Sequence, residues 1–225
     1  MADGDDTPEP SKLIRTKRNW ARAGRFLTGT AARPETSRLP PGQHLVRDWP
    51  VLDLGVQPAV AEADWRLSAF GLVETPLVWD WAEFNALPQS RFTSDIHCVT
   101  TWSRYDNTWE GVATRDVVEA VRPMPEARFV LLYAHDGYTT NLPLADFAAE
   151  DALLAHSWEG ARLSRVHGGP VRLVVPRLYF WKSAKWLRAI EFLAEDQPGF
   201  WEERGYHKRG DPWAEERYSG GEKDR

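Results

Sequence analysis

The chain contains a single cysteine, Cys98, and this constrains its fold more than any other feature. No internal disulfide can form, so a packed hydrophobic core must hold the protein together. With 225 residues and 42% hydrophobic content, the chain can bury a sizeable core. The thiol also bears on function, because it can be a buried small hydrophobe, a reactive nucleophile or a ligand for a soft metal.

Charge and hydropathy narrow the class of protein. The formal net charge of −5 argues against a nucleic-acid partner, which normally meets a basic surface. No apolar run approaches the roughly 20 residues needed to cross a bilayer, and no apolar stretch follows the N-terminal charges as a signal peptide requires. We therefore expect a cytoplasmic protein that does not insert into a membrane.

The chain divides into an arm and one domain. Residues 1–30 begin with an acidic stretch and continue with a basic one at 12–25, and we expect a disordered or extended arm. The basic stretch is either a docking site for an anionic partner or, as charge runs usually are, a solvated segment. Residues 31–225 are expected to form a single domain, with an aromatic and charged tail at 198–218 wrapping around it.

Local patterns predict a mixture of strands and short helices. Apolar alternation or continuous apolar runs predict strands at 65–70, 91–102, 129–134 and 171–175. Helices are predicted at 80–87 from an Asp80–Glu83 capping box, at 114–122 behind a Thr114 cap, and at 143–149 behind Pro143. Turns are predicted at 135–138 and 156–160. Residues 186–193 fit helix and strand equally well.

Cys98 falls within the predicted strand at 91–102. Successive side chains of a strand point to opposite faces, so His97 and Cys98 are not expected to bind one metal together. His44, His97, His135 and His207 belong to no motif, and we expect them to be surface or hydrogen-bonded side chains.

Residues 167–190 form the densest segment of the chain. Gly168 and Gly169 let the backbone approach another group closely, an apolar strand follows, and Lys182, Ser183 and Lys185 come next. Such a loop can bind a phosphate through lysine charges, a hydroxyl and backbone amides, or it can be a structural turn.

Three segments resemble one family in the same order. Cys98-Val99, followed by Trp102-Ser103 and by Trp109 and Gly111, resembles the metal-ligating cysteine strand of the sulfite-oxidase family. The resemblance is strongest to its bacterial branch related to the methionine sulfoxide reductase catalytic subunit. His167-Gly-Gly-Pro-Val-Arg172-Leu-Val-Val-Pro176, continuing to Lys185-Trp186-Leu187, resembles the family's pterin-binding signature. Leu45-Val46-Arg47-Asp48-Trp49 is more loosely similar to the segment that supplies the substrate-side arginine.

The resemblance implies a fold and a cofactor. The fold is the α+β catalytic domain of sulfite oxidases, with mixed β-sheets and short helices around a buried molybdopterin. The cofactor is molybdenum with one molybdopterin that carries no nucleotide, and Cys98 is the metal ligand, a role that suits a soft thiolate. The cofactor-binding residues implied by the family are Asp136, His167, Arg172, Ser183, Ala184 and Lys185.

The resemblance also implies an activity. This is two-electron oxygen-atom transfer on a small oxyanion, sulfoxide or N-oxide, with Cys98, Arg47 and His156 as catalytic residues. His156 stands where sulfite oxidases carry a tyrosine, and Trp49 where a histidine follows the arginine, so sulfite is the less favoured substrate. The chain shows no haem domain or dimerisation domain, and we expect a monomer that exchanges electrons with a separate protein.

Two other functions compete with this interpretation. The first is an enzyme without a metal, in which a nearby histidine activates Cys98 as a nucleophile. The second is a ligand-binding module that uses the twelve tryptophans as stacking platforms. Tryptophans spread along strands are more typical of core packing.

Overall fold

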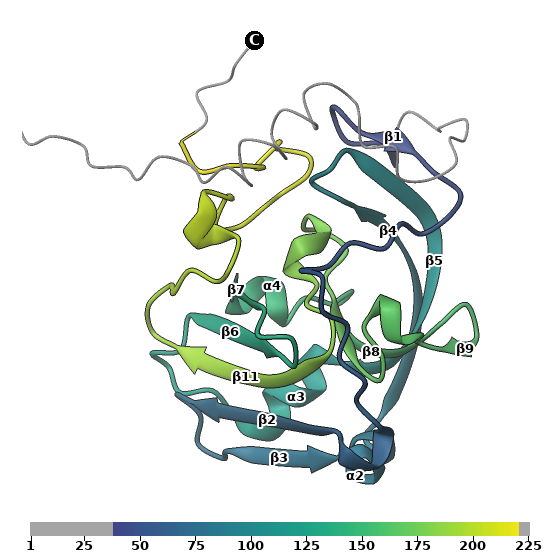
Figure 1. Ribbon diagram of the computed structural model, residues 1–225. Coiled ribbons are helices and arrows are strands. Elements are labelled where there is room, and N and C mark those ends of the chain that lie inside the picture. The colour runs from purple at the N-terminus through teal and green to yellow at the C-terminus, as the bar shows by residue number, and fades with distance from the viewer. Residues whose placement is uncertain (1–37, 221–225) are drawn as a thin grey trace, which may run out of the picture.

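Two β-sheets share one hydrophobic core in the computed structural model, which describes residues 38–220 (Figure 1). The first sheet consists of β1 (His44–Leu45), β4 (Gln89–His97), β5 (Trp102–Ala113), β8 (Leu153–Trp158), β9 (Ala161–Arg162) and β10 (Arg172–Val174). The second, in the order β3-β2-β11-β6-β7, consists of β2 (Arg66–Gly71), β3 (Leu77–Asp80), β6 (Phe129–Ala134), β7 (Thr139–Pro143) and β11 (Leu187–Leu193). The pairs β1–β5 and β2–β11 are parallel, whereas β4–β5 and β6–β11 are antiparallel. The expected α+β fold with mixed sheets is confirmed.

The helices are short. They are α2 (Trp81–Ala86), α3 (Thr114–Val121) and α4 (Leu144–Phe147), with the 3-10 turns η2 (Glu62–Asp64), η3 (Arg165–His167), η4 (Phe180–Lys182) and η5 (Glu202–Arg204). Helix α2 carries the predicted capping box, in which Glu83 N donates to Asp80 Oδ1 and Asp80 N donates to Glu83 Oε2, each at 2.9 Å.

The other two helices begin differently from the prediction. Thr114 does not cap α3, because its hydroxyl donates to the carbonyls of Phe147 and Ala152 instead. Helix α4 is a single turn, and Pro143 precedes it as the last residue of β7 rather than as its first helical residue. In both cases a tertiary contact decides a boundary that local sequence cannot fix.

The first sheet corrects two predictions. Strand β4 ends at His97, so Cys98 lies in the turn before β5 and not within a strand. The turn is tight, because Cys98 N donates to Trp102 O at 2.8 Å and Thr101 adopts a φ of 77°. His156 lies inside β8, and the turn predicted at 156–160 is confined to Glu159 and Gly160.

Residues 186–193, whose periodicity fitted helix and strand equally well, contain strand β11. It lies between β2 and β6 in the second sheet, parallel to one and antiparallel to the other. Its burial does not alternate strictly, because Ala189 and Ile190 are both buried in succession, which is why the sequence pattern fits helix equally well.

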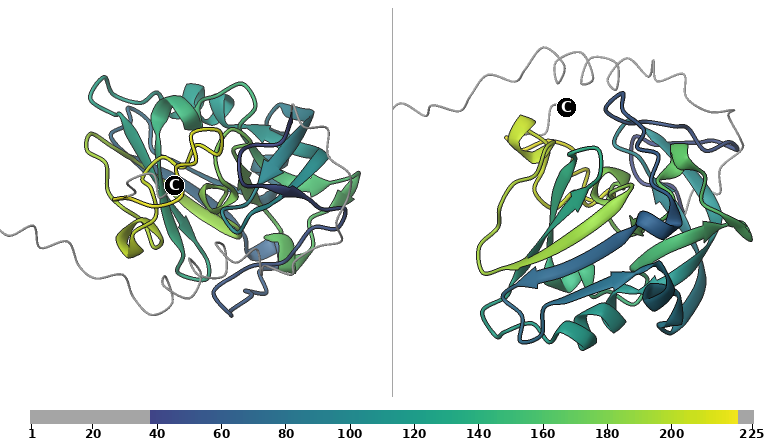
Figure 2. Two further views of the ribbon diagram at one scale, coloured as in Figure 1. Left: turned by 90° about the horizontal axis from the view of Figure 1, so that it is seen from above. Right: turned by 60° about the horizontal axis from the view of Figure 1, so that its bottom comes forward.

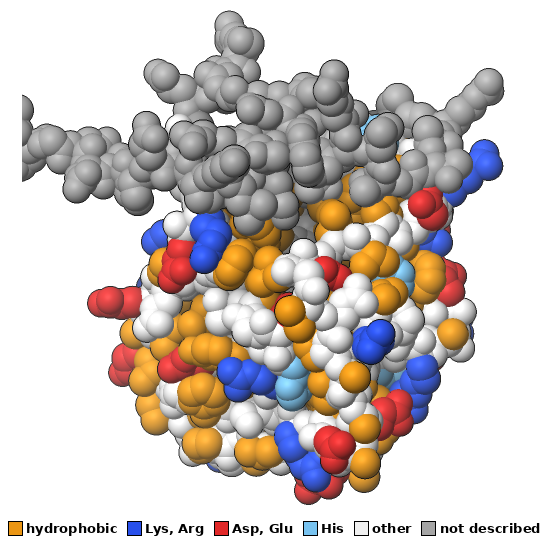
Figure 3. All heavy atoms as spheres, viewed as in Figure 1, with side chains coloured by type: hydrophobic (Ala, Val, Ile, Leu, Met, Phe, Trp, Pro, Cys, Tyr) orange, Lys and Arg blue, Asp and Glu red, His pale blue; other side chains and the backbone are white. Residues whose placement is uncertain are grey.

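Most tryptophans of the described chain are core residues, as expected. Trp65 and Trp109 are fully buried, and Trp102 and Trp186 are 1% exposed, whereas Trp213 is 52% exposed. Figure 2 shows the two sheets curving around this core. The face seen in Figure 3 carries acidic and basic side chains interspersed over its described part. The predicted arm at 1–30 lies outside the described residues.

No helix within residues 38–220 has the length and apolar character needed to cross a membrane.

Candidate active site

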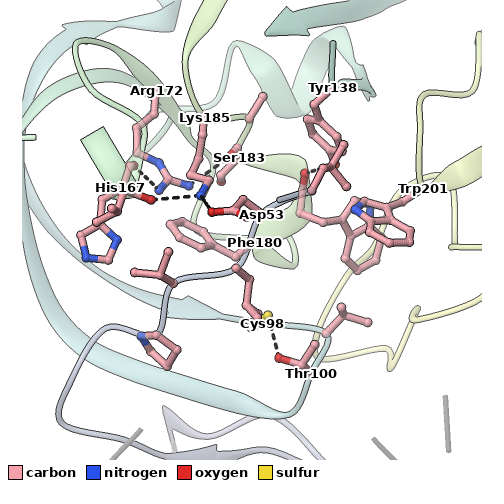
Figure 4. Close-up of a pocket in the computed structure, with 18 of the residues that line it drawn as sticks. Asp53, Cys98, Thr100, Tyr138, His167, Arg172, Phe180, Ser183, Lys185 and Trp201 are labelled. Carbon is pink, nitrogen blue, oxygen red and sulfur yellow. Dashed lines mark hydrogen bonds and ion pairs between the residues drawn. The ribbon is translucent and has the colours of Figure 1, made fainter. Parts of the chain in front are cut away.

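Loops from both sheets line one cavity. It is lined by the segment that follows β1, by the β4–β5 and β6–β7 turns, and by the chain between η3 and β11. Its empty volume is about 830 Å³, the open mouth included. Cys98 faces it from the β4–β5 turn (Figure 4). The residues expected to contact a cofactor line the same cavity: Asp136, His167, Arg172, Ser183, Ala184 and Lys185.

Cys98 is presented by a turn that is fixed from several directions. The side-chain amide of Gln43 donates to Cys98 O at 3.0 Å, and Arg217 Nη1 donates to Val99 O at 2.7 Å. The Cys98 sulfur lies 3.1 Å from the hydroxyl oxygen of Thr100, and the side chain is 7% exposed. The sulfur is therefore close to rigid and faces the cavity, which suits a ligand that must keep one position.

Arg172 is a buried cation held by main-chain carbonyls. Its guanidinium donates to His167 O and Ser183 O, each at 2.8 Å, and to Leu173 O at 3.3 Å. Its carbon lies 4.2 Å from the centre of the Phe180 ring. Burial lowers the pKa of Arg172 to about 9. Three of its five N–H groups are used by these carbonyls, which leaves two for a bound ligand.

Two further bases stand beside Arg172. Lys185 Nζ donates to Val166 O at 3.0 Å and lies 3.7 Å from Asp53 Oδ2. Burial and the nearby Arg172 charge lower the pKa of Lys185 to about 8. His167 stacks on Trp49 with ring centres 3.8 Å apart, and burial followed by the charge of Arg172 lowers its pKa to about 4. The imidazole is therefore uncharged at neutral pH.

Ser183 and Ala184 contribute mainly through the main chain. Besides the Ser183 carbonyl that binds Arg172, Ser183 Oγ accepts from Val175 N at 3.0 Å and Ala184 O accepts from Leu173 N at 2.9 Å. Asp136 also lines the cavity. Its Oδ1 accepts from Tyr138 N at 3.0 Å, and burial raises the pKa of its carboxyl group.

Gly168 permits the close packing of its own loop against Lys185. Its φ is +104°, and a Cβ at this position would lie 2.8 Å from Lys185 Cβ. The close approach predicted for the glycine pair is therefore a contact with the chain itself, since Gly168 approaches Lys185 and Gly169 approaches the main chain of Leu163. A larger residue would push the lysine away from the cavity.

The structure places two of the predicted catalytic residues outside the cavity lining. Arg47 is exposed and is not among the lining residues, because the chain turns its side chain to the surface of the β1 segment. His156 is buried in β8, where Nε2 lies 2.9 Å from Gln89 Oε1 and Arg162 Nη1 donates to Nδ1 at 3.0 Å. Both ring nitrogens are thus engaged, so this histidine has no free position with which to assist a substrate.

Several lining residues were missed by sequence reasoning. Asp53 enters from the segment before β2, Tyr138 from the β6–β7 turn, and Trp201 and Tyr206 from the C-terminal tail. No motif marks them, because segments distant in sequence bring them to the cavity. Only the aromatic content of the tail gave a signal, and it indicated wrapping rather than a place in the site.

The residues present fit a phosphorylated metal cofactor. Arg172 and Lys185 place two cations at one end, and burial lowers the pKa of each, so a bound anion would stabilise both charges. Within residues 38–220, Trp102 Nε1 and the Tyr179 hydroxyl are buried without a hydrogen-bond partner, and Trp102 lines the cavity. A thiol faces the same space. A soft metal ligand, unpaired donors and a cationic anchor define a protein that binds such a cofactor.

The described residues include no group of three or more His, Cys, Asp or Glu side chains that could hold a metal ion by themselves.

Comparison with known proteins identifies the family. Residues 54–201 match the oxidoreductase molybdopterin binding domain, so the chain belongs to this family of molybdopterin-binding oxidoreductases. It is 47% identical over 195 residues to the uncharacterized oxidoreductase YuiH of Bacillus subtilis, an alignment that covers 86% of this chain and 98% of that protein. The cofactor is molybdenum bound by molybdopterin, as expected from the sequence.

More distant relatives agree with this assignment. The chain is 29% identical over 162 residues to the protein-methionine-sulfoxide reductase catalytic subunit MsrP of Campylobacter jejuni, with 62% of this chain and 52% of that protein covered. It spans about half the length of that relative. The sulfane dehydrogenase SoxCD of Paracoccus pantotrophus shares the fold, with a TM-score of 0.57 and 22% identity over 62% of this chain and 40% of that one.

The depressed pKa of Lys185 predicts how the stability of the cofactor-free protein depends on pH. The folded lysine loses its proton near pH 8, whereas an unfolded lysine holds it to about pH 10.4. Between these values the unfolded state binds more protons, so the free energy of unfolding gains a contribution that rises with pH, up to about 3 kcal/mol. Arg172, His167, Asp53 and Asp136 are the charged or titratable neighbours.

The measurement is urea unfolding of cofactor-free wild type and Lys185→Met at pH 7.5, 8.5 and 9.5. The variant should be the more stable at pH 7.5, and this advantage should shrink as pH rises, because the variant lacks the lysine whose buried charge the wild type loses in this range. A difference that stays constant across this range contradicts the lowered pKa.

Proposed function

We propose that this chain reduces an uncharged S-oxide or N-oxide by two-electron oxygen-atom transfer at its molybdenum cofactor. The reaction takes the oxygen of the substrate, two electrons and two protons, and releases the thioether or amine and water. The electrons come from a separate protein. The proposal also places the enzyme in the cytoplasm as a monomer.

One observation carries the proposal: Cys98 and the Arg172–Lys185 cations occupy different parts of one cavity (Figure 4). When bound, the cofactor supplies a redox centre that exchanges two electrons and accepts or releases an oxygen atom. Cys98 holds the metal through its thiolate, while Arg172 and Lys185 hold the phosphate as charge-assisted donors. The chain thereby fixes both ends of the cofactor.

The remaining groups near Cys98 favour an uncharged substrate. With Arg47 outside the cavity, the lining cations are Arg172 and Lys185, which serve the cofactor. Within residues 38–220, Trp102 lines the cavity and its indole N–H is buried without a hydrogen-bond partner, so this uncharged group can donate to a substrate oxygen. A donor without a second charge stabilises a polar S–O or N–O group better than it attracts an oxyanion.

The nucleophile alternative gains no support from the histidine next to Cys98 in the sequence. His97, the histidine adjacent in sequence, directs Nδ1 to the Ser103 hydroxyl at 2.8 Å, and burial lowers its pKa to about 4. The hydroxyl of Thr100, which contacts the Cys98 sulfur, is too weak a base to take a thiol proton.

The test combines cofactor analysis with turnover. Protein made in a host that builds the cofactor should contain close to one molybdenum and one pterin per chain. With reduced methyl viologen as the electron donor, it should reduce dimethyl sulfoxide or trimethylamine N-oxide and fail to oxidise sulfite. Arg47→Ala is the matched control, and we expect its kcat/KM to stay within about twofold of wild type because the side chain is exposed. Sulfite oxidation at a higher kcat/KM than either reduction contradicts the proposal, and so does a large Arg47→Ala effect.

A further inference from the structure

The cavity has two unlike sides. Figure 4 shows Arg172, Lys185, Ser183 and Asp53 grouped together, with Trp201 across the cavity from them. Trp181, Trp201 and Tyr206 also line it, and we call these three residues the aromatic wall. On the polar side, Arg172, Ser183 and Lys185 come from the η3–β11 segment and Asp53 from the segment before β2. Two of the three wall residues come from the C-terminal tail.

The aromatic wall is a packed unit. Trp201 and Tyr206 stack with ring centres 4.9 Å apart and an interplanar angle of 21°, and Tyr206 meets Trp181 edge-on at 5.1 Å. Trp201 is 7% exposed and Tyr206 is 2% exposed. The family match ends at residue 201, so Tyr206 lies beyond the matched part of the domain.

A buried ion pair fixes the tail that carries this wall. Lys182 Nζ lies 2.6 Å from Glu202 Oε1, and both side chains are fully buried. The same ammonium donates to Lys208 O at 2.5 Å, so one cation holds the tail on both sides of Tyr206. Glu202 Oε1 also accepts from Trp181 Nε1 at 2.8 Å and from Thr140 Oγ1 at 3.0 Å. The ion pair therefore binds wall residues from η4 and from the tail to one another.

Close backbone contacts add to this attachment. A Cβ on Gly199 would lie 2.5 Å from Thr139 O and from Thr140 Cα, and a Cβ on Gly210 would lie 2.7 Å from the Trp181 ring. Tyr179 N donates to Gly210 O at 2.7 Å. The tail thus follows β7 and η4 at main-chain distance on both sides of the wall.

We propose that Trp201 and Tyr206 select the substrate by its substituents, and that the Lys182–Glu202 pair positions them. The inference rests on the proposed function and specifies its substrate further. Aromatic faces attract apolar groups and positively polarised sulfur or nitrogen, and they disfavour anions. The preferred substrates carry an aromatic or bulky alkyl group on the sulfur or nitrogen that bears the oxygen.

The first test compares two substrates on the cofactor-loaded enzyme. Tyr206→Leu should raise KM for methyl phenyl sulfoxide about tenfold with kcat little changed, because the ring contact is present before and during the reaction. KM for dimethyl sulfoxide should change less than about threefold. Trp213→Ala is the matched control, since Trp213 belongs to the same tail but is 52% exposed and does not line the cavity. Equal effects on both substrates, or no effect on either, overturn the wall assignment.

A binding measurement separates this inference from the proposed function. Methyl phenyl sulfone has the same substituents but is not expected to turn over, and its dissociation constant can be measured by calorimetry on the loaded protein. Tyr206→Leu should weaken its binding about tenfold whether or not the enzyme reduces sulfoxides. Absence of sulfoxide turnover in wild type contradicts the proposed function. Unchanged sulfone binding in the variant contradicts the role of the aromatic wall in substrate selection.

The second test addresses the positioning pair. Glu202→Gln should reproduce the KM pattern of Tyr206→Leu and speed trypsin cleavage after Arg204 and Lys208 about tenfold, because the tail loses its ionic attachment. Lys182→Met, which removes the other half of the pair, serves if Glu202→Gln does not fold. Faster cleavage without a change in KM for methyl phenyl sulfoxide shows that the pair has no positioning role.

Discussion

Cys98→Ser is expected to keep the fold and to lower turnover at least about a thousandfold, which is about 4 kcal/mol of activation free energy. The serine side chain has the same shape as cysteine and is slightly smaller, so the β4–β5 turn should be undisturbed. It is a harder and more basic ligand, which remains protonated at neutral pH and binds a soft metal poorly. Molybdenum content, the visible absorption of the metal–thiolate bond and thermal unfolding are the measurements.

Thr100→Val is the control for this prediction. It removes the hydroxyl that lies 3.1 Å from the sulfur but leaves the thiolate in place. We expect about a tenfold loss or less, with molybdenum content retained, because the hydroxyl only orients or tunes the ligand. Turnover by Cys98→Ser within tenfold of wild type contradicts the ligand assignment.

The part of the cavity lining that comes from one continuous segment was predictable from sequence, and the part that comes from distant segments was not. Gly168, Arg172 and Lys185 lie in one continuous segment, so their spacing in sequence constrains their spacing in space. Cys98 was predictable because it is the only thiol. The structure moves it from a strand to a turn, yet the thiol still faces the same cavity.

The positions of Arg47 and His156 relative to the cavity depend on side-chain direction. Arg47 and His156 were placed by alignment with a family pattern, which gives a position along the chain but not the face of the element. A one-residue change in register turns a strand side chain to the opposite face, and His156 in β8 points to Gln89 and Arg162 instead of the cavity. Tyr206 was missed for a related reason, since only tertiary packing brings the tail to the site.

Some elements of the fold could likewise be predicted from local sequence, whereas others could not. The capping box at Asp80–Glu83 was predictable because both partners are three residues apart, and β6 because it is a short apolar run. Strand β11 was ambiguous because its identity depends on β2 and β6 as neighbours. Local hydrogen bonds are thus readable from sequence, whereas sheet pairing depends on contacts between distant segments.

Replacing Arg172 should remove cofactor while changing the stability of the cofactor-free protein much less. Arg172→Leu leaves three carbonyls without their donor, at about 1–3 kcal/mol each when buried. It also removes a charge whose burial costs about 5 kcal/mol, as the fall in pKa to about 9 indicates. These effects oppose one another. The loss of charge-assisted bonds to a phosphate has no compensation and should lower cofactor affinity about tenfold to a hundredfold.

The measurement is molybdenum and pterin per chain at limiting cofactor, with urea unfolding of the cofactor-free proteins alongside. Arg172→Lys is the matched control, because it keeps a positive charge but cannot reach three carbonyls and a ligand at once. Its occupancy should fall between wild type and Arg172→Leu if charge and geometry both matter. Full pterin occupancy in Arg172→Leu means that the guanidinium serves only the loop it stabilises. In that case Lys185, with its lowered pKa, is the remaining cation of the anchor.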